Sequence, residues 1–224
     1  MCARYAYFNG KLIQDDFGVV PLPDLTPRYN AAPTQWMPVV LDDGETRVAR
    51  LHRWGLVPSW AKDIAFGTNA INARAETLAE KPAFRSAFAQ RRCIVPADGF
   101  YEWHTEGKVK TPYFIQRADG KRLAMAGLFE TWNGPDGPIP TFTIVTTEAN
   151  QQMTFFHDRM PVILEESDWE AWLDGDVVPG AVESLMKPFE GQLILSPANK
   201  AVGKPSVEGP ELLTPSVPEQ TALF

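Results

Sequence analysis

The stretch from Arg91 to Trp103 reads RRCIVPADGFYEW and holds two segments of strand-like composition on either side of a short turn. Small and β-branched apolar residues fill the first segment, and aromatic residues flank Glu102 in the second, as is typical of β-strands. Gly99 lies between the two segments, where a turn is expected. The stretch therefore indicates a chain built on β-strands.

Similar strand-like segments occur along most of the chain, and helical patterns are few. They are residues 3–8, 46–56, 112–117, 122–129, 141–147, 160–164 and 192–197. Helical patterns occur at 81–91 and 167–175, with one short turn in 148–156, and 132–140 resembles a hairpin loop. Because strands do not alternate with helices, a doubly wound parallel sheet is disfavoured. We predict an α+β fold, a single domain with a mainly antiparallel, barrel-like β core and a few short helices.

The composition is that of an ordinary globular protein, with 44% hydrophobic and 22% charged residues among 224. We expect one domain over residues 1–213 and a loosely ordered tail over 214–224, because the segment from Lys204 onward is Pro-rich and polar. We expect no membrane span and no secretory signal. The two cysteines form no disulfide framework, so a cytoplasmic location is expected.

The net charge of −7 at first argues against nucleic acid as a partner, but the charges are unevenly distributed. Residues 1–110 carry 14 Lys and Arg against 12 Asp and Glu, whereas residues 111–224 carry 7 against 16. A local basic groove in the first half remains compatible with these numbers, since the position of the arginines decides where a nucleic acid binds.

Few side chains are candidates for chemistry. Of three histidines, only His157, next to Asp158 and Arg159, suggests a chemical role, and a solvated charged turn is the simpler interpretation. Scattered histidines and two distant cysteines predict no zinc site. Glu102, between two aromatic residues, is either an exposed acid or a carboxyl with a raised pKa that is suited to proton transfer.

Other polar and aromatic residues are candidates for a binding site because of their positions in the sequence. Asn72, Arg74 and Glu76 alternate along NAINARAETL, so they share a face if the segment is a strand. Trp60 follows a Pro-Ser turn, and a tryptophan on a loop can stack on an unpaired base. Several arginines, including Arg4 and Arg159, lie at these motifs; each alone is typical of a surface ion pair, but together they suggest an anion such as phosphate.

Eight segments, in this order, resemble the successive motifs of the SRAP family, the SOS response-associated peptidases or abasic-site shielding proteins. They are MCARY, RYNAAPTQ, RWGLVPSW, INARAET, RRCIVPADGFYEW, PYFI, TIVTTEAN and HDRMPVIL. The resemblance extends from Cys2 to about Leu213. It implies a protein that binds abasic sites in single-stranded DNA and crosslinks to them through the cysteine after Met1. It also implies one compact domain, no metal and no cofactor.

The resemblance further implies roles for individual residues. The reactive residues of the family correspond to Cys2, Asn72, Glu102 and His157. Its DNA contacts correspond to Arg4, Asn30, Pro33, Trp60, Arg74, Thr146 and Arg159. The chain departs from the family where Ala3 replaces a commoner glycine and where Met160 occupies a position at which arginine also occurs. The expected protein is monomeric, and it is cytoplasmic and nucleoid-associated when bound to DNA.

The chemistry explains why a cysteine is needed at this position. The ring-opened abasic sugar is an aldehyde, and an amine attacks it to give a Schiff base. An α-amine has a pKa of about 7.7–8.0, so a useful fraction is neutral near pH 7. Once Met1 has been removed, the thiol of Cys2 can add to the same carbon and close a thiazolidine ring, aided by proximity. Glu102 and His157 would transfer protons, and the arginines would hold phosphates without reading sequence.

Two other functions are compatible with the sequence. Cys2, His157 and Glu102 could form a thiol peptidase whose substrate event is the removal of Met1 in cis. The chain could also be a DNA-binding module without a covalent step. Retention of DNA on a denaturing gel, and its loss in Cys2→Ala, distinguishes the crosslinking function from both.

Overall fold

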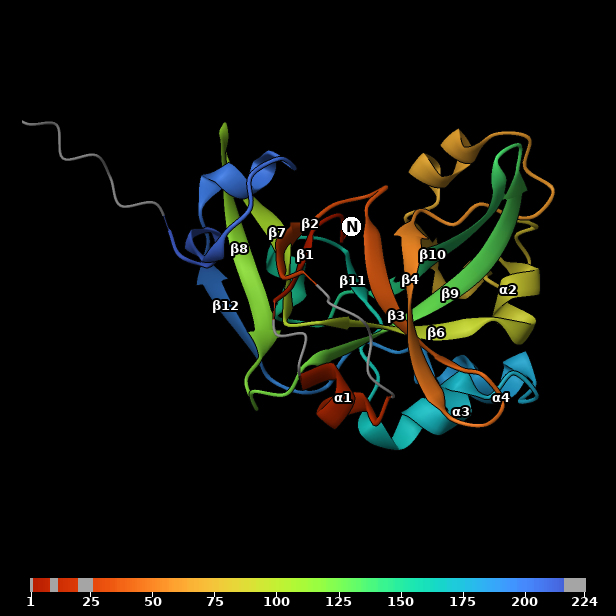
Figure 1. The fold of residues 1–224 in the computed structure, drawn as a ribbon. Helices are drawn as coiled ribbons and strands as arrows, with labels where there is room; N and C mark the ends of the chain where they lie inside the picture. The colour runs from red at the N-terminus through yellow and green to blue at the C-terminus, as the bar shows by residue number, and fades with distance from the viewer. Residues whose placement is uncertain (1, 9–11, 20–25, 216–224) are drawn as a thin grey trace, which may run out of the picture.

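The computed structural model describes residues 2–8, 12–19 and 26–215. Its centre is a ring of five strands, β3 (Trp36–Asp42), β4 (Arg47–Trp54), β6 (Arg92–Ala97), β9 (Leu123–Gly134) and β10 (Gly137–Glu148). The strands pair in the order β10-β4-β3-β6-β9, and β9 pairs with β10 to close the ring (Figure 1). All of these pairings are antiparallel except that of β10 with β4. The predicted barrel-like, mainly antiparallel core is therefore confirmed.

A second sheet lies beside the barrel and has the order β12-β8-β7-β1-β2 (Figure 1). Its strands are β1 (Tyr5–Tyr7), β2 (Arg28–Ala31), β7 (Gly99–Glu106), β8 (Val109–Arg117) and β12 (Leu193–Pro197). Only Asp98 separates β6 of the barrel from β7 of this sheet. The stretch 91–103 thus carries the chain from one sheet into the other.

The passage between the two sheets requires a glycine at position 99. A Cβ atom there would lie 2.4 Å from Cζ of Phe114 and 2.7 Å from the carbonyl oxygen of Ile115. Both distances are too short for any side chain, and the second neighbour is backbone. Gly99 therefore allows β7 to leave the barrel and pair closely with β8.

Two short strands extend the barrel sheet where the candidate site residues lie. β5 (Asn72–Arg74) pairs parallel with β10, and β11 (Arg159–Pro161) pairs antiparallel with β10. The sequence pattern predicted neither parallel pairing of β10, because strand propensity carries no information about the partner strand.

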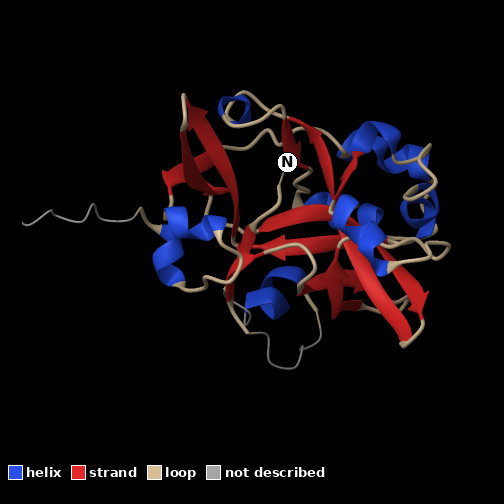
Figure 2. Ribbon diagram, turned by 90° about the horizontal axis from the view of Figure 1, so that it is seen from above, coloured by secondary structure: helices blue, strands red, loops and turns tan. Residues whose placement is uncertain are grey.

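Short helices lie around the outside of the strands (Figure 2). They are α1 (Leu12–Phe17), α2 (Arg85–Gln90), α3 (Trp169–Leu173) and α4 (Pro179–Val182), and the 3₁₀ turns η1 (Ile64–Asn69), η2 (Ala75–Thr77), η3 (Met153–Phe155), η4 (Glu166–Asp168), η5 (Glu183–Leu185), η6 (Lys200–Gly203) and η7 (Pro210–Leu213). The helices predicted within 81–91 and 167–175 and the turn in 148–156 are confirmed. None of the helices in the described ranges has the length and apolar character of a membrane span.

The predicted loop at 132–140 is wrong for most of its length. β9 continues to Gly134 and β10 starts at Gly137, so the turn is only two residues long. Trp132 explains the extension, because its indole nitrogen donates a hydrogen bond to the carbonyl of Ala61 at 2.7 Å and the side chain is buried. This contact holds the end of β9 in a region whose Gly and Pro content favours a loop.

The segment after Lys204 is also held more firmly than its composition predicts. Leu212 is fully buried. The carboxylate of Glu208 accepts hydrogen bonds from the backbone nitrogens of Tyr29 at 2.8 Å and Asn30 at 3.2 Å. Residues 204–213 therefore pack on β2, whereas residues 216–224 of the predicted tail lie outside the described residues.

Candidate active site

Cys2 is fully buried next to β7, although it lies at the start of the described chain. Tyr5 of β1 pairs with Phe100 of β7, and the nitrogen of Tyr101 donates to the carbonyl of Arg4 at 3.0 Å. This ladder brings Cys2 toward Glu102. Burial and, next, the negative charge of Glu102 raise the pKa of the Cys2 thiol well above its ordinary value. At neutral pH the thiol is therefore protonated.

Asn72 holds the backbone of Cys2. Its side-chain nitrogen donates a hydrogen bond to the carbonyl oxygen of Cys2 at 2.9 Å. β5 presents Asn72 from the barrel side, where it pairs with Ile144 of β10. The Asn72 Oδ1 atom is buried and accepts no hydrogen bond from the described part of the chain. This neutral acceptor beside Cys2 is suited to an amine or an amine-derived adduct.

Glu102 lies on β7 and is only 6% exposed. Burial raises the pKa of its carboxyl group, and the nearby His157 offsets part of that effect. A carboxyl with a pKa raised toward neutrality can both donate and accept a proton, which is the requirement for general acid–base catalysis. Its electrostatic influence on Cys2 shows that the two side chains share one environment.

His157 follows η3 and lies close enough to Glu102 to affect its ionisation. Its Nδ1 atom accepts a hydrogen bond from the backbone nitrogen of Arg159 at 3.0 Å and lies 2.5 Å from a carboxylate oxygen of Asp158. The first contact needs a lone pair on Nδ1 and the second needs a proton there. The Asp158 side chain is 84% exposed, so solvent weakens its contact. In the Arg159 contact, Nδ1 is the acceptor.

Two of the predicted phosphate-binding arginines flank Glu76. The guanidinium of Arg159 donates to both carboxylate oxygens of Glu76, at 2.6 and 3.0 Å, and to the carbonyl of Thr146 at 2.5 Å. The Arg159 hydrogen bond is the main cause that lowers the pKa of Glu76, and the charge of Arg74 adds to it. Arg74 itself is exposed at the end of β5.

Arg4 lies one strand step beyond Cys2 and is half-buried. Its guanidinium donates to the carbonyl of Ala3 at 2.8 Å. Cys2, Asn72, Glu102 and His157 therefore lie close together, and Arg4, Arg74 and Arg159 lie near them.

Comparison with known proteins shows the family of the chain. Residues 1–205 match the family model described as SOS response associated peptidase (SRAP). The chain belongs to the SRAP family. It is 40% identical to the abasic site processing protein YoqW of Bacillus subtilis over 221 residues, which cover 95% of this chain and 99% of YoqW. It is 42% identical to YoaM, another abasic site processing protein of the same organism, over 197 residues, 85% of this chain and 87% of YoaM.

Among solved structures, the SRAP fold described here matches the crystal structure of a protein from Bacteroides thetaiotaomicron. The TM-score is 0.87 at 27% sequence identity, and the match covers 96% of this chain and all of the other. The barrel and the second sheet are therefore shared with an experimentally determined structure.

Two other residues that were predicted to contact DNA, Asn30 and Thr146, are buried and stabilise the elements around the candidate site. Asn30 is fully buried, and its amide donates to the carbonyls of Lys204 at 2.9 Å and Val207 at 3.0 Å. Thr146 is also fully buried; its hydroxyl donates to the carbonyl of Ala73 at 3.4 Å, between β10 and β5. The contacts of Asn30 hold the C-terminal segment, and those of Thr146 hold β5 and Arg159.

Pro33 and Trp60 lie nearer the surface. Trp60 is 58% exposed, with its ring edge-to-face with that of Phe66 at 5.4 Å. Pro33 is partly buried, and Thr34 after it has a φ of 75°, in the left-handed region that β-branched residues rarely adopt. The hydrogen bond from the nitrogen of Thr34 to the carbonyl of Trp54, at 2.8 Å, holds this strained loop.

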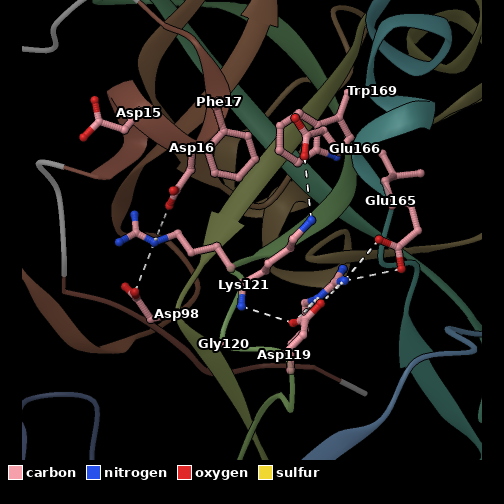
Figure 3. Close-up of a pocket in the computed structure, with 13 residues that line it drawn as sticks. Asp15, Asp16, Phe17, Asp98, Asp119, Gly120, Lys121, Glu165, Glu166 and Trp169 are labelled. Carbon is pink, nitrogen blue, oxygen red and sulfur yellow. Dashed lines mark hydrogen bonds and ion pairs between the residues drawn. The ribbon is translucent and has the colours of Figure 1, made fainter.

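A separate charged pocket of about 490 Å³ contains none of the predicted site residues (Figure 3). Its cations contact its own acids: Arg117 lies 2.6 Å from Asp119 and 3.1 Å from Glu165, and Arg122 lies 3.1 Å from Asp98. Acids of the pocket therefore already neutralise both arginines. Within the described ranges, no three His, Cys, Asp or Glu side chains converge as they would around a metal ion.

Proposed function

We propose that this SRAP protein recognises abasic sites in single-stranded DNA and crosslinks to them through Cys2 after Met1 is removed. The observation that carries the proposal is the hydrogen bond from Asn72 to the carbonyl of Cys2, because it fixes the residue with the 1,2-aminothiol beside the buried Glu102. The names of the relatives, abasic site processing proteins, support the choice of substrate.

The first step joins the α-amine of Cys2 to C1′ of the ring-opened sugar. The amine lone pair forms the C–N bond and the carbonyl oxygen becomes a hydroxyl. Glu102 in its protonated form then gives a proton to that hydroxyl, which leaves as water to produce the iminium ion. The raised pKa of Glu102 increases the fraction of the acid that is protonated at a given pH.

The second step closes the thiazolidine ring. The Cys2 sulfur forms a bond to the same carbon, the C=N electron pair returns to nitrogen, and the thiol proton passes to the Glu102 carboxylate. Overall, aldehyde and aminothiol give thiazolidine and water, and Glu102 ends in its starting state. Because amine and thiol belong to one residue, the ring closure is intramolecular and fast. His157 would hold the sugar oxygen and assist proton transfer in either direction.

The protonated, buried thiol argues against a thiol peptidase acting in trans. Catalytic cysteines of that kind are ionised by an adjacent cation and partly exposed, whereas burial and the charge of Glu102 keep the Cys2 thiol neutral. Removal of Met1 in cis and Schiff-base lyase chemistry are compatible with the same groups and belong to this proposal. The proposed setting is cytoplasmic, with a monomer that associates with the nucleoid when it binds damaged DNA.

The test uses single-stranded DNA with one abasic site, analysed on a denaturing gel and by mass spectrometry of the intact protein. We expect a heat-resistant protein–DNA band and a protein mass that shows loss of Met1. The band should be absent in Cys2→Ala and in protein with an N-terminal tag.

Cys93→Ala is the matched control, because Cys93 is also a buried, free cysteine but lies within β6. It should crosslink at the wild-type rate. Crosslinking by Cys2→Ala at the wild-type level would overturn the role of Cys2. No crosslinking by the Met1-free wild type would overturn the proposal and favour a non-covalent binding module.

A further inference from the structure

A pair of stacked aromatic rings lies beside the candidate site. His104 follows Glu102 by two residues on β7, so both side chains lie on the same face of the strand. Tyr113 of β8 pairs directly with Glu102 and shares that face. The face that carries the buried carboxyl therefore continues outward as an aromatic surface.

Phe155 of η3 completes this surface. Its ring is stacked on the imidazole of His104, with the ring centroids 3.8 Å apart and the planes 7° from parallel. The carbonyl oxygen of Phe155 lies 3.1 Å from Nδ1 of His104, and because a carbonyl only accepts, Nδ1 carries the proton. The stack and the hydrogen bond together fix both rings.

Two further rings support the pair from the side. The Phe156 ring lies 5.0 Å from that of Tyr113, and edge-on to those of Phe155 and His104. Phe156 packs on the main core, so it connects the pair to the rigid part of the molecule. Phe155 itself remains 53% exposed. Burial of apolar surface does not explain why Phe155 is an aromatic residue, because its ring is held in place while about half of it remains exposed.

We infer that the Phe155–His104 pair is a stacking subsite for the base next to the abasic nucleotide. The inference rests on the proposed function, since it takes the abasic sugar to lie at Cys2 and Glu102. A base that borders an abasic site has lost one stacking neighbour, and an aromatic ring can replace it. Stacking on a ring tolerates any base, as lesion recognition requires.

The spacing agrees with this assignment. Phe155 lies two residues before His157, and His104 two residues after Glu102. Two residues along a strand span ~6.6 Å, a distance that an unstacked single strand covers in one nucleotide step. The subsite and the arginines therefore have separate tasks: Arg74 and Arg159 contact the backbone, and the ring pair contacts a base.

The experiment measures binding rather than crosslinking. The probe is a single-stranded oligonucleotide with one tetrahydrofuran abasic analogue and 2-aminopurine on its 5′ or 3′ side. We expect the wild type to quench the 2-aminopurine on one of the two sides. Phe155→Leu, which keeps an apolar side chain but loses the ring, should abolish the quenching and weaken binding roughly tenfold. Phe155→Trp should retain both the quenching and the wild-type affinity.

A second abasic analogue in place of that flanking base provides a double-mutant cycle. It should weaken binding by the wild type but not by Phe155→Leu. The salt dependence of binding should be unchanged in Phe155→Leu and reduced in Arg74→Ala, because stacking releases no counterions. Val178→Ala, at an exposed apolar residue that precedes α4, is the matched control and should bind as the wild type does.

The inference fails if folded Phe155→Leu binds and quenches as the wild type does, or if removal of the flanking base weakens both proteins equally. Failure of the proposed function looks different: the wild type then forms no crosslink with genuine abasic DNA. The fluorescence arm still measures stacking in that case. Wild-type crosslinking together with an unaffected Phe155→Leu would overturn the subsite alone.

Discussion

Burial of Glu102 has a cost in stability and fits the proton transfer proposed above. Its pKa is raised by burial, so the folded state disfavours the carboxylate relative to the unfolded chain. The destabilisation of the folded state is absent below the pKa of Glu102 in the unfolded chain, about 4.3. It grows as the pH rises toward the raised pKa of Glu102 in the folded protein. A residue kept at such a cost is typical of a functional site.

We therefore predict that Glu102→Gln slows crosslinking and raises stability at neutral pH. Gln has the shape of Glu but no charge, so it cannot exchange a proton and is cheaper to bury. Thermal unfolding should give a higher Tm at pH 7.5. At this chain length, a gain of about 1 kcal/mol in the free energy of unfolding raises the Tm by about 2–4 °C. The gain should disappear at pH 4. An equal gain at both pH values would show that charge is not its cause.

In the proposed DNA complex, the charge of Glu76 opposes binding of a phosphate at Arg159. Its carboxylate occupies the fork of the Arg159 guanidinium, where a phosphate would also bind, and it lies near Arg74. We predict that Glu76→Gln tightens binding of single-stranded DNA roughly three- to tenfold at low salt, because the local potential becomes more positive.

Fluorescence anisotropy with the tetrahydrofuran oligonucleotide measures this effect. Glu80→Gln is the control, since Glu80 is an exposed acid on the same segment and the two changes alter net charge equally. If both variants bind DNA equally tightly, net charge rather than the Arg159 contact is responsible.

At the scale of elements, Arg92 joins the barrel to two helices. Its side chain is only 1% exposed and donates to the carbonyls of Phe88 and Ala89 in α2. It also donates to the carbonyls of Trp172, Asp174 and Val177 in and after α3. The carbonyls of Phe88, Ala89 and Trp172 lie in the last turns of α2 and α3, where they lack helical partners, so one guanidinium satisfies groups that would otherwise be buried unpaired.

We predict that Arg92→Met lowers the free energy of unfolding by about 3 kcal/mol, because Met fills the volume but leaves several carbonyls unsatisfied. Chemical denaturation measures the loss. Arg85→Met, at an exposed position of α2, should change stability by less than about 0.5 kcal/mol. A similar loss in both variants would mean that the carbonyl contacts of Arg92 are not the cause of the loss.

At the scale of the whole molecule, the C-terminal segment is part of the fold. Asn30 holds Lys204 and Val207, and Glu208 in turn holds the backbone of β2. Residues more than 170 positions apart thus keep β2 and the second sheet in place. This sheet carries both β1, next to Cys2, and β7, with Glu102.

We predict that Asn30→Ala costs about 2 kcal/mol of stability through its lost buried hydrogen bonds. Hydrogen exchange should become faster in residues 204–213 before it does in the barrel strands, because the segment opens separately from the core. Exchange that accelerates equally throughout would show that the segment and the barrel unfold as one unit.

The sequence predicted the elements better than their partners. β-Branched and aromatic content identified most strands, and the short helices followed from local apolar spacing. The strands β2, β3 and β5 were not predicted, and two further missed features depend on distant contacts: Trp132 extends β9 through Ala61, and Leu212 holds a segment whose composition suggested a loose tail. Local propensity contains no information about such contacts, so it assigned both segments to loops.

Propensities and ordered motifs are properties of the linear chain, so they were sufficient to predict the strand-rich fold class and the family. Which groups meet one another depends on how the chain folds. The Asn72–Cys2 contact crosses 70 positions, the Arg159–Glu76 pair 83, and the His104–Phe155 contact 51. Whether such groups lie at hydrogen-bond distance depends on sheet pairing and core packing, which involve the whole chain at once.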